Sequence, residues 1–304
     1  MKILVTGSSG QLGCEIRRHS ADSGHEYIFT AVRTNEKEPW LFPLDITDEK
    51  SVMEAVTPDI DVIINCAAYT DVNRAESDPD AAYKVNALAA DNLAKAALKA
   101  DALLIHISTD YVFDGEASMP YVEDAPTAPC NVYGKSKLAG EEAVISSGCR
   151  YMIFRTSWLY SNTGRNFFLT MADLLAEKPT IKVVMDQTGT PTYAYDLAYF
   201  ICGLIDGGKL DKTGVYHYSN EGVCSWYDFA KEICMLFGHT CRIEPCLTEE
   251  FPSPAARPHY SVMDKTKVKE TFGIEIPHWK ESLILAVREY CQIKGRFVPY
   301  NKYI

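Results

Sequence analysis

Tyr133 and Lys137 lie four positions apart in the segment Tyr-Gly-Lys-Ser-Lys. On a helix, positions i and i+4 share one face, so the ammonium would lie beside the phenol. A neighbouring cation lowers the pKa of a phenol from its ordinary value of about 10 towards neutrality. Such a phenol can give its proton to a carbonyl oxygen while a hydride reaches the carbonyl carbon. The pair therefore predicts carbonyl reduction, with Tyr133 as the acid.

The spacing alone is weak, because it recurs on two segments that we interpret as surfaces of C-terminal helices, Tyr227 with Lys231 and Tyr290 with Lys294. What favours Tyr133 is the segment Ser108–Asp110, which follows an apolar run. Parallel sheets bind ligands at the carboxyl ends of their strands. A hydroxyl there can polarise the same carbonyl. The alternative is that these residues only form a turn, which Ser, Thr and Asp all favour.

Three glycines, Gly7, Gly10 and Gly13, lie between a short apolar run and a helical pattern. In a dinucleotide-binding turn, the first glycine allows a sharp turn and the second lets the backbone approach a pyrophosphate. The third lets the helix pack on the strand, and the helix N-terminus points at the anion. The placement predicts a dinucleotide site, although such glycines also occur for packing alone.

The position that would bind the adenosine ribose carries a basic residue. An Asp or Glu is expected there, about 20 residues after the turn, and counting from Gly13 reaches Arg33. An arginine suits a 2′-phosphate, so we predict NADPH, with NADH as the alternative. Arg33 could instead be a solvated loop cation, and Glu36 or Glu38 could reach the ribose. Asp45, after the third strand, is expected near the adenine, or as the cap of the next helix.

Short apolar runs alternate with helical patterns through the first half of the chain. This alternation predicts an α/β fold of the Rossmann type, with a doubly wound parallel sheet. Residues 1–156, with a return segment of about 186–220, would form the dinucleotide-binding domain. A smaller α+β substrate lobe would comprise about 157–185 and 221–304. The strands are predicted at 2–6, 27–32, 40–44, 61–65, 102–108 and 151–156, and the helices at 11–21, 48–57, 79–99 and 135–145.

Composition excludes several classes of function. Thirty Lys and Arg oppose 41 Asp and Glu, and the net charge of −11 argues against nucleic-acid binding. No run approaches the roughly 20 apolar residues of a membrane span, and no signal peptide is evident. The ten cysteines form no Cys-x-x-Cys pair, which is typical of reduced thiols in a cytoplasmic protein. The histidines lack metal-ligand spacing, so no metal is predicted.

Together these motifs resemble the extended short-chain dehydrogenase/reductases, and among them the dTDP-4-dehydrorhamnose reductases. The resemblance runs almost from end to end. The glycine turn and the Tyr–Lys pair are shared by the whole superfamily, whereas the blocks Ser108–Gly115, Arg155–Tyr160 and Asp186–Thr192 are much more specific. The blocks are Gly7–Gly13, Leu44–Thr47, Asn65–Val72 followed by Ala75 and Glu76, Ser108–Gly115, Tyr133–Lys137, Arg155–Tyr160, Asp186–Thr192, and Arg257–Pro258 with Ser261.

The resemblance implies reduction of a 4-keto-6-deoxy dTDP-sugar to dTDP-L-rhamnose. Tyr133 would donate the proton, and Lys137 would tune it and hold the nicotinamide ribose. Thr109 would hydrogen-bond the keto oxygen, and with Asp110 and Trp158 it would touch the sugar. Further cofactor contacts would fall on Gly10, Gln11, Leu12, Asp45, Ile46, Ala67, Ala68, Tyr69 and Ile107.

Arg257 is the candidate for the substrate diphosphate, because its fork of donors suits phosphate oxygens; a surface salt bridge is the alternative. Certain members of the family carry an acid where Arg33 stands. Some members form dimers through magnesium bound by acids, of which Glu15 and Asp196 remain, but Tyr193 and Tyr195 stand in that neighbourhood. A monomer or a homodimer is therefore expected, without metal.

Two other functions stay open. A nucleotide-sugar epimerase or dehydratase would share the fold, but a dehydratase would want an acid directly after Asp110, where Tyr111 stands. A regulatory protein resembling the β subunit of methionine adenosyltransferase would need no catalysis. The intact Thr109, Tyr133, Lys137 and Trp158 favour an enzyme.

Overall fold

The computed structural model describes residues 1–33 and 38–295. Its centre is a sheet of seven strands in the order β11-β6-β5-β4-β1-β2-β3, all paired in parallel. The order reverses at β1, and open α/β sheets bind ligands beside such a switch point. This sheet confirms the predicted fold class. Its strands are β1 (Lys2–Thr6), β2 (Glu26–Ala31), β3 (Leu41–Pro43), β4 (Val62–Asn65), β5 (Leu103–Thr109), β6 (Arg150–Thr156) and β11 (Gly214–His217).

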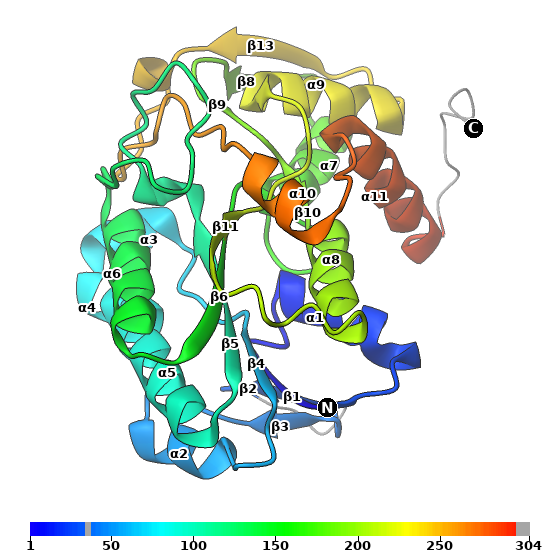
Figure 1. Ribbon diagram of the computed structural model, residues 1–304. Helices are drawn as coiled ribbons and strands as arrows, with labels where there is room; N and C mark the ends of the chain where they lie inside the picture. Colours follow the sequence, from blue (N-terminus) through cyan, green and yellow to red (C-terminus); the bar gives the residue numbers. More distant parts are fainter. Residues whose placement is uncertain (34–37, 296–304) are drawn as a thin grey trace.

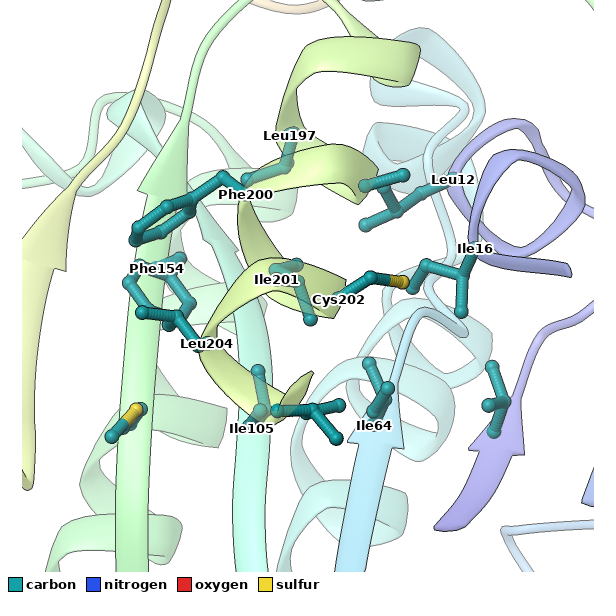
Figure 2. Close-up of a cluster of buried hydrophobic side chains, with 14 of the residues drawn as sticks. Leu12, Ile16, Ile64, Ile105, Phe154, Leu197, Phe200, Ile201, Cys202 and Leu204 are labelled. Atoms are coloured by element: carbon teal, nitrogen blue, oxygen red, sulfur yellow. The ribbon is translucent and has the colours of Figure 1, made fainter. Parts of the chain in front are cut away.

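Helices cover both faces of this sheet (Figure 1). One face packs on α1 (Gln11–His19) and α8 (Ala194–Asp206), and Figure 2 shows Ile16 of α1 beside Cys202 of α8, in one cluster with Ile64 and Ile105 of the sheet. The other face packs on α2 (Glu49–Ala55), α5 (Ala89–Ala100) and α6 (Val132–Ser146). Burial on both faces explains why the strands are continuous apolar runs rather than alternating ones.

The segment predicted as one helix at 79–99 is helical throughout but changes its winding. It consists of α4 (Pro79–Tyr83), a π-helical turn (Lys84–Leu88) and α5. Asp78 caps its start by accepting from the Ala81 backbone N–H at 3.3 Å. Single π turns inside α-helices are frequent at functional sites.

The carboxyl-terminal half of the chain forms a second core. It is built from α7 (Phe167–Glu177), α9 (Trp226–Phe237) and α11 (Trp279–Ile293), which Figure 1 shows at the opposite end from α2. Three two-stranded sheets accompany these helices: β7 (Leu159–Tyr160) with β10 (Thr192–Tyr193), β9 (Thr188–Gly189) with β12 (Cys224–Ser225), and β8 (Thr180–Val184) with β13 (Arg242–Cys246). The remaining elements are α3 (Val72–Ser77), α10 (Thr266–Phe272) and short 3₁₀ turns at 20–22, 110–112 and 248–250.

The segment from α8 to β11 returns to the main sheet, where β11 pairs with β6 and α8 packs on α1. The helix predicted at 135–145 begins earlier, at Val132, because the Asn131 side chain caps it by accepting from the Gly134 N–H at 2.8 Å. Among the described helices, none combines the length and apolar character that crossing a bilayer requires.

Candidate active site

The turn between β1 and α1 is built for close backbone approach. Gly7 has φ +65°, and a Cβ there would lie 2.5 Å from the Ala67 backbone nitrogen. A Cβ on Gly13 would lie 2.6 Å from the Gly7 carbonyl oxygen. Gly10 precedes α1 without any side-chain cap, so the first N–H groups of the helix stay open to an anion.

A groove of about 520 Å³ opens beside this turn. Four loops converge on it: the glycine turn and the loops after β2, β3 and β4. A fifth side comes from the π-helical turn, through Lys84 and Val85, which the sequence analysis did not single out. Seven predicted cofactor residues line the groove, namely Gly7, Gly10, Arg33, Asp45, Ile46, Ala67 and Ala68.

Asp45 and Arg33 occupy the part of the groove expected for adenosine. The Asp45 carboxylate accepts from the Thr47 backbone N–H at 2.9 Å and its hydroxyl at 2.7 Å. The alternative role of Asp45 as a helix cap is wrong, because Asp48 caps α2. Arg33 is exposed and lines the groove, whereas Glu36 lies outside the described residues.

Gln11 and Leu12 direct their side chains away from the groove. The Gln11 amide donates to the Leu159 carbonyl at 3.5 Å and accepts from Asn166 Nδ2 at 2.8 Å and Ser161 Oγ at 3.2 Å. Leu12 is buried in the core beneath the sheet's helices. Only the backbone of these two residues can therefore serve a cofactor, and the Gln11 side chain joins the glycine turn to the segment after β7.

The predicted Tyr133–Lys137 pair lies at the start of α6. Lys137 is buried, and its Nζ donates to the Ile107 carbonyl of β5 at 2.6 Å. The phenol of Tyr133 interacts with the Thr109 side chain at the end of the same strand. A Cβ on Gly134 would lie 2.2 Å from the Tyr111 carbonyl oxygen, so the glycine lets the helix approach the loop after β5. The structure thus brings the acid, the amine and the strand end together.

The expected lowering of the Tyr133 pKa is wrong for the chain without ligands. Burial raises the pKa of the phenol, and the fields of Asp110 and Tyr111 act in the same direction, against the hydrogen bond from Thr109. Burial also lowers the pKa of Lys137 to about 8, although Glu141 opposes this. Desolvation penalises the charged form of both groups. The phenol is therefore fully protonated at neutral pH.

Thr109 and Asp110 close the end of β5. The Thr109 hydroxyl donates to Asp110 Oδ1 at 3.0 Å and accepts from the Tyr111 N–H at 3.2 Å, so the turn-forming alternative describes part of its role. Asp110 is 2% exposed, and burial raises the pKa of its carboxyl to about 7, against hydrogen bonds from Ser261 and Thr109. Its Oδ2 and the Ser108 hydroxyl have no hydrogen-bond partner among the described residues.

Arg257 reaches the same region from the C-terminal part of the chain. Its guanidinium donates to the Tyr111 hydroxyl at 3.3 Å and to Asn73 Oδ1 at 3.1 Å. The ring of Tyr111 in turn meets the ring of Tyr133 edge to face at 5.8 Å. Both partners of the guanidinium are neutral, and within the described ranges Arg257 forms no ion pair, so the salt-bridge alternative does not apply.

Trp158, the remaining predicted sugar contact, follows β6. Its indole stacks on that of Trp226 with ring centroids 3.6 Å apart and an interplanar angle of 8°. A Cβ added to Gly189 would lie 2.6 Å from the Trp158 ring and 2.9 Å from Ser261 Oγ. Because Ser261 interacts with Asp110, Trp158 borders the end of β5. Tyr69 lies after β4, where its backbone N–H donates to Asn86 Oδ1 at 2.8 Å.

The acids considered for a metal have other partners. Asp196 accepts from Asn220 at 2.7 Å and Ser282 at 2.5 Å. Glu15 lies beside Arg18 and Glu289, and burial raises its pKa to about 7. In the described part of the chain, no three His, Cys, Asp or Glu side chains converge as a metal site requires.

Four residues of this region were not predicted as site residues: Tyr111, Asn73, Lys84 and Trp226. Tyr111 stands inside the quoted motif Ser108–Gly115, so its neighbourhood was a usable signal. The other three come from separate segments that only the fold brings to the site.

Known proteins match this chain along almost its whole length. Residues 1–292 match the family model described as RmlD substrate binding domain. The spore coat polysaccharide biosynthesis protein SpsK of Bacillus subtilis (strain 168) is 40% identical over 96% of this chain and 97% of its own length. A solved dTDP-4-dehydrorhamnose reductase from Clostridium acetobutylicum has a TM-score of 0.88 and 43% identity, covering 95% of this chain and 99% of that one.

A second solved dTDP-4-dehydrorhamnose reductase, from Bacillus anthracis and in complex with NADP, has a TM-score of 0.84 and 39% identity over 95% of this chain and 99% of that one. These matches confirm the resemblance that the motifs carried. The chain belongs to the RmlD family and is an NAD(P)-dependent sugar-nucleotide reductase of that family.

Proposed function

We propose that this protein reduces the 4-keto group of dTDP-4-dehydrorhamnose, with NADPH as the hydride donor, to give dTDP-L-rhamnose. The observation that carries the proposal is the convergence of Tyr133, Lys137 and Thr109 at the end of β5, beside the dinucleotide groove. The assignment of the acid, the amine and the sugar contacts to these positions is part of the proposal.

The groove fits a dinucleotide on its own geometry. The places that a Cβ would fill at Gly7 and Gly13 are taken by backbone, so the turn can lie close to a pyrophosphate, and the uncapped N-terminus of α1 supplies N–H donors. The loops holding Asp45, Ile46 and Ala67 would enclose the adenosine half. When bound, the cofactor supplies the hydride.

Tyr133 would protonate the keto oxygen. Its raised pKa keeps the phenol in the donor form at neutral pH, which is the form that a reduction consumes. Thr109 interacts with this phenol and would hold the same oxygen through its hydroxyl. Lys137, fixed on the Ile107 carbonyl, would orient the nicotinamide ribose and offset the negative charge left on the phenol.

Arg257 would bind the substrate diphosphate. Within the described part of the chain, the guanidinium is held only by the neutral oxygens of Tyr111 and Asn73, which leave its charge uncompensated, and its fork of donors matches phosphate oxygens. Tyr111 links this cation to the Tyr133 ring. The diphosphate and the reacting carbonyl would thus be held by neighbouring groups, with Asp110 and Trp158 against the sugar.

The preference for NADPH follows from the cations of the groove. Among the described residues that line it, Arg33 and Lys84 are cationic and Asp45 is the one carboxylate, and a 2′-phosphate brings a negative charge to this wall. The Bacillus anthracis relative was solved with NADP, which supports the same cofactor class. NADH remains the alternative, and Arg33→Glu should shift the ratio of kcat/KM towards it.

The test is a panel of dTDP-, GDP- and UDP-linked 4-keto-6-deoxy sugars, each assayed with NADPH and NADH through the nicotinamide absorbance. We expect turnover with the dTDP-sugar and its loss in Tyr133→Phe, with NADPH binding retained. Tyr227→Phe is the matched control, because Tyr227 and Lys231 repeat the spacing on α9, away from β5. Near-full turnover by Tyr133→Phe would refute the proposed mechanism. A higher kcat/KM for a GDP- or UDP-linked sugar would refute the proposed substrate.

A further inference from the structure

Trp158 has a backbone conformation that large side chains avoid. Its φ is +47°, and the only other described non-glycine residue with positive φ is Asp101, an ordinary left-handed C-cap of α5. Left-handed backbone at a bulky residue is strained and persists only where the surroundings enforce it. Because such strain gathers at functional sites, the contacts that hold Trp158 need an explanation.

Two contacts hold the indole. Trp226 stacks on it in parallel at 3.6 Å, and Gly189 lies so close that any Cβ would strike the ring at 2.6 Å. The Trp158 carbonyl also accepts from the Thr192 N–H at 3.2 Å. Trp226 and Gly189 thus form a clamp on the indole. Trp158 remains partly exposed, so the clamp leaves part of the ring free.

One short sheet supplies both sides of the clamp. In the antiparallel pair of β9 and β12, Gly189 lies opposite Cys224, and Trp226 follows directly as the first residue of α9. The start of α9 is fixed by a capping box, in which Ser225 and Asp228 exchange hydrogen bonds of 3.1 and 3.0 Å. The backbone at Trp226 is therefore fixed at the start of the helix.

The stack continues into the second core. Phe167, the first residue of α7, lies 4.5 Å from Trp226, between ring centroids, and 5.6 Å from Phe229. At the other end, the Trp158 ring and the Ser261 hydroxyl both lie against the Cα of Gly189, where a Cβ would strike either of them. Ser261 in turn interacts with Asp110. A row of aromatic rings thus leads from the second core to Trp158, and Ser261 connects this end of the row with Asp110, just after β5.

We propose that Trp226 is a positioning residue for sugar-nucleotide recognition: it holds Trp158 in the left-handed conformation in which the free part of the indole meets the sugar. The proposal rests on the proposed function. Trp226 acts through Trp158, so the affinity for the sugar nucleotide depends on it, whereas cofactor binding and proton transfer from Tyr133 do not.

The experiment compares Trp226→Leu, Trp226→Phe, Trp158→Phe and the double variant Trp158→Phe/Trp226→Leu. We expect Trp226→Leu to raise KM for the sugar nucleotide about three- to tenfold, the worth of an aromatic pair, with kcat and the Kd for NADPH unchanged. Trp226→Phe should recover part of the loss. The double variant should be no worse than Trp158→Phe, since coupled residues are not additive.

A spectroscopic measurement separates positioning from general destabilisation. Two stacked indoles give an exciton couplet in circular dichroism, which Trp158→Phe and Trp226→Phe should each abolish. Trp40→Phe is the control that keeps it, since Trp40 packs against Arg17 and Phe29, far along the chain from the stack.

Additive effects of the two tryptophans on KM, or an equal rise in the Kd for NADPH, would overturn the proposal. If the wild-type protein turns over none of the sugar nucleotides, the proposed function fails by itself. The inference is then tested by calorimetric binding of dTDP-L-rhamnose to the same variants, where equal Kd values in wild type and Trp226→Leu would overturn it.

Discussion

Replacing Lys137 by Met should reveal how much folding stability the protein gives up to keep an ammonium at this site. The side chain is 2% exposed, and its Nζ donates a hydrogen bond to the Ile107 carbonyl. Burial lowers its pKa to about 8, from about 10.4 in an unfolded chain. The folded state therefore binds this proton less tightly than the unfolded state, so the group destabilises the fold at neutral pH.

The sign and size follow from linkage. Below the folded pKa the penalty is complete, and a shift from about 10.4 to about 8 corresponds to about 3 kcal/mol. As pH rises through the folded pKa the penalty falls, and it vanishes above the unfolded pKa. Between about pH 7 and about pH 9.5, wild type should thus gain about 2 kcal/mol relative to Lys137→Met. Loss of the hydrogen bond to Ile107 shifts the variant's stability by a constant amount and leaves this slope unchanged.

The assay is urea unfolding of the cofactor-free protein across that pH range, with m-values compared to verify that both proteins unfold alike. Lys135→Met is the matched control: it lies on the same helix two residues earlier and is exposed, so its difference from wild type should be flat with pH. If the stability difference between wild type and Lys137→Met also stays constant with pH, the reasoning is refuted. The folded state would then bind the lysine proton as tightly as the unfolded chain does.

Three other substitutions test the frame of the site. Glu141→Gln should cost about 3–5 kcal/mol in urea unfolding, since it leaves the buried Arg155 guanidinium, now 2.7 Å from the carboxylate, without its counter-charge; a loss below about 1 kcal/mol would place the pair among surface ion pairs. Gly134→Ala drives a Cβ into the Tyr111 carbonyl, so kcat should fall while NADPH affinity, measured by fluorescence titration, persists; unchanged kcat would contradict the close approach. Gln11→Leu should cost about 1–3 kcal/mol by leaving polar partners unpaired and should spare NADPH affinity; a large rise in the NADPH Kd would mean that the side chain contacts the cofactor.

Local patterns were sufficient for the sheet and the glycine turn, because buried parallel strands are short apolar runs and a strand–glycine–helix turn is contiguous in the chain. The start of α6 was set three residues late, although Asn131 is a readable cap. Trp226 and Lys84 were missed for another reason. Each reaches the site from a segment far from the motifs, and only the sheet order and the β9–β12 pair bring them there.

The pKa of Tyr133 shows where a spacing argument ends. Four residues of separation predict that Lys137 shares a helix face with Tyr133, but spacing carries no information about burial. In the folded chain burial raises the pKa of the phenol and outweighs the hydrogen bond from Thr109. The raised pKa of Tyr133 bears on the direction of the proposed reaction. Oxidation of an alcohol needs the phenolate as base, whereas reduction of a ketone needs the protonated phenol. A site that keeps the Tyr133 phenol protonated at neutral pH holds the proton that the proposed reduction would consume, so the raised pKa agrees with the proposed direction.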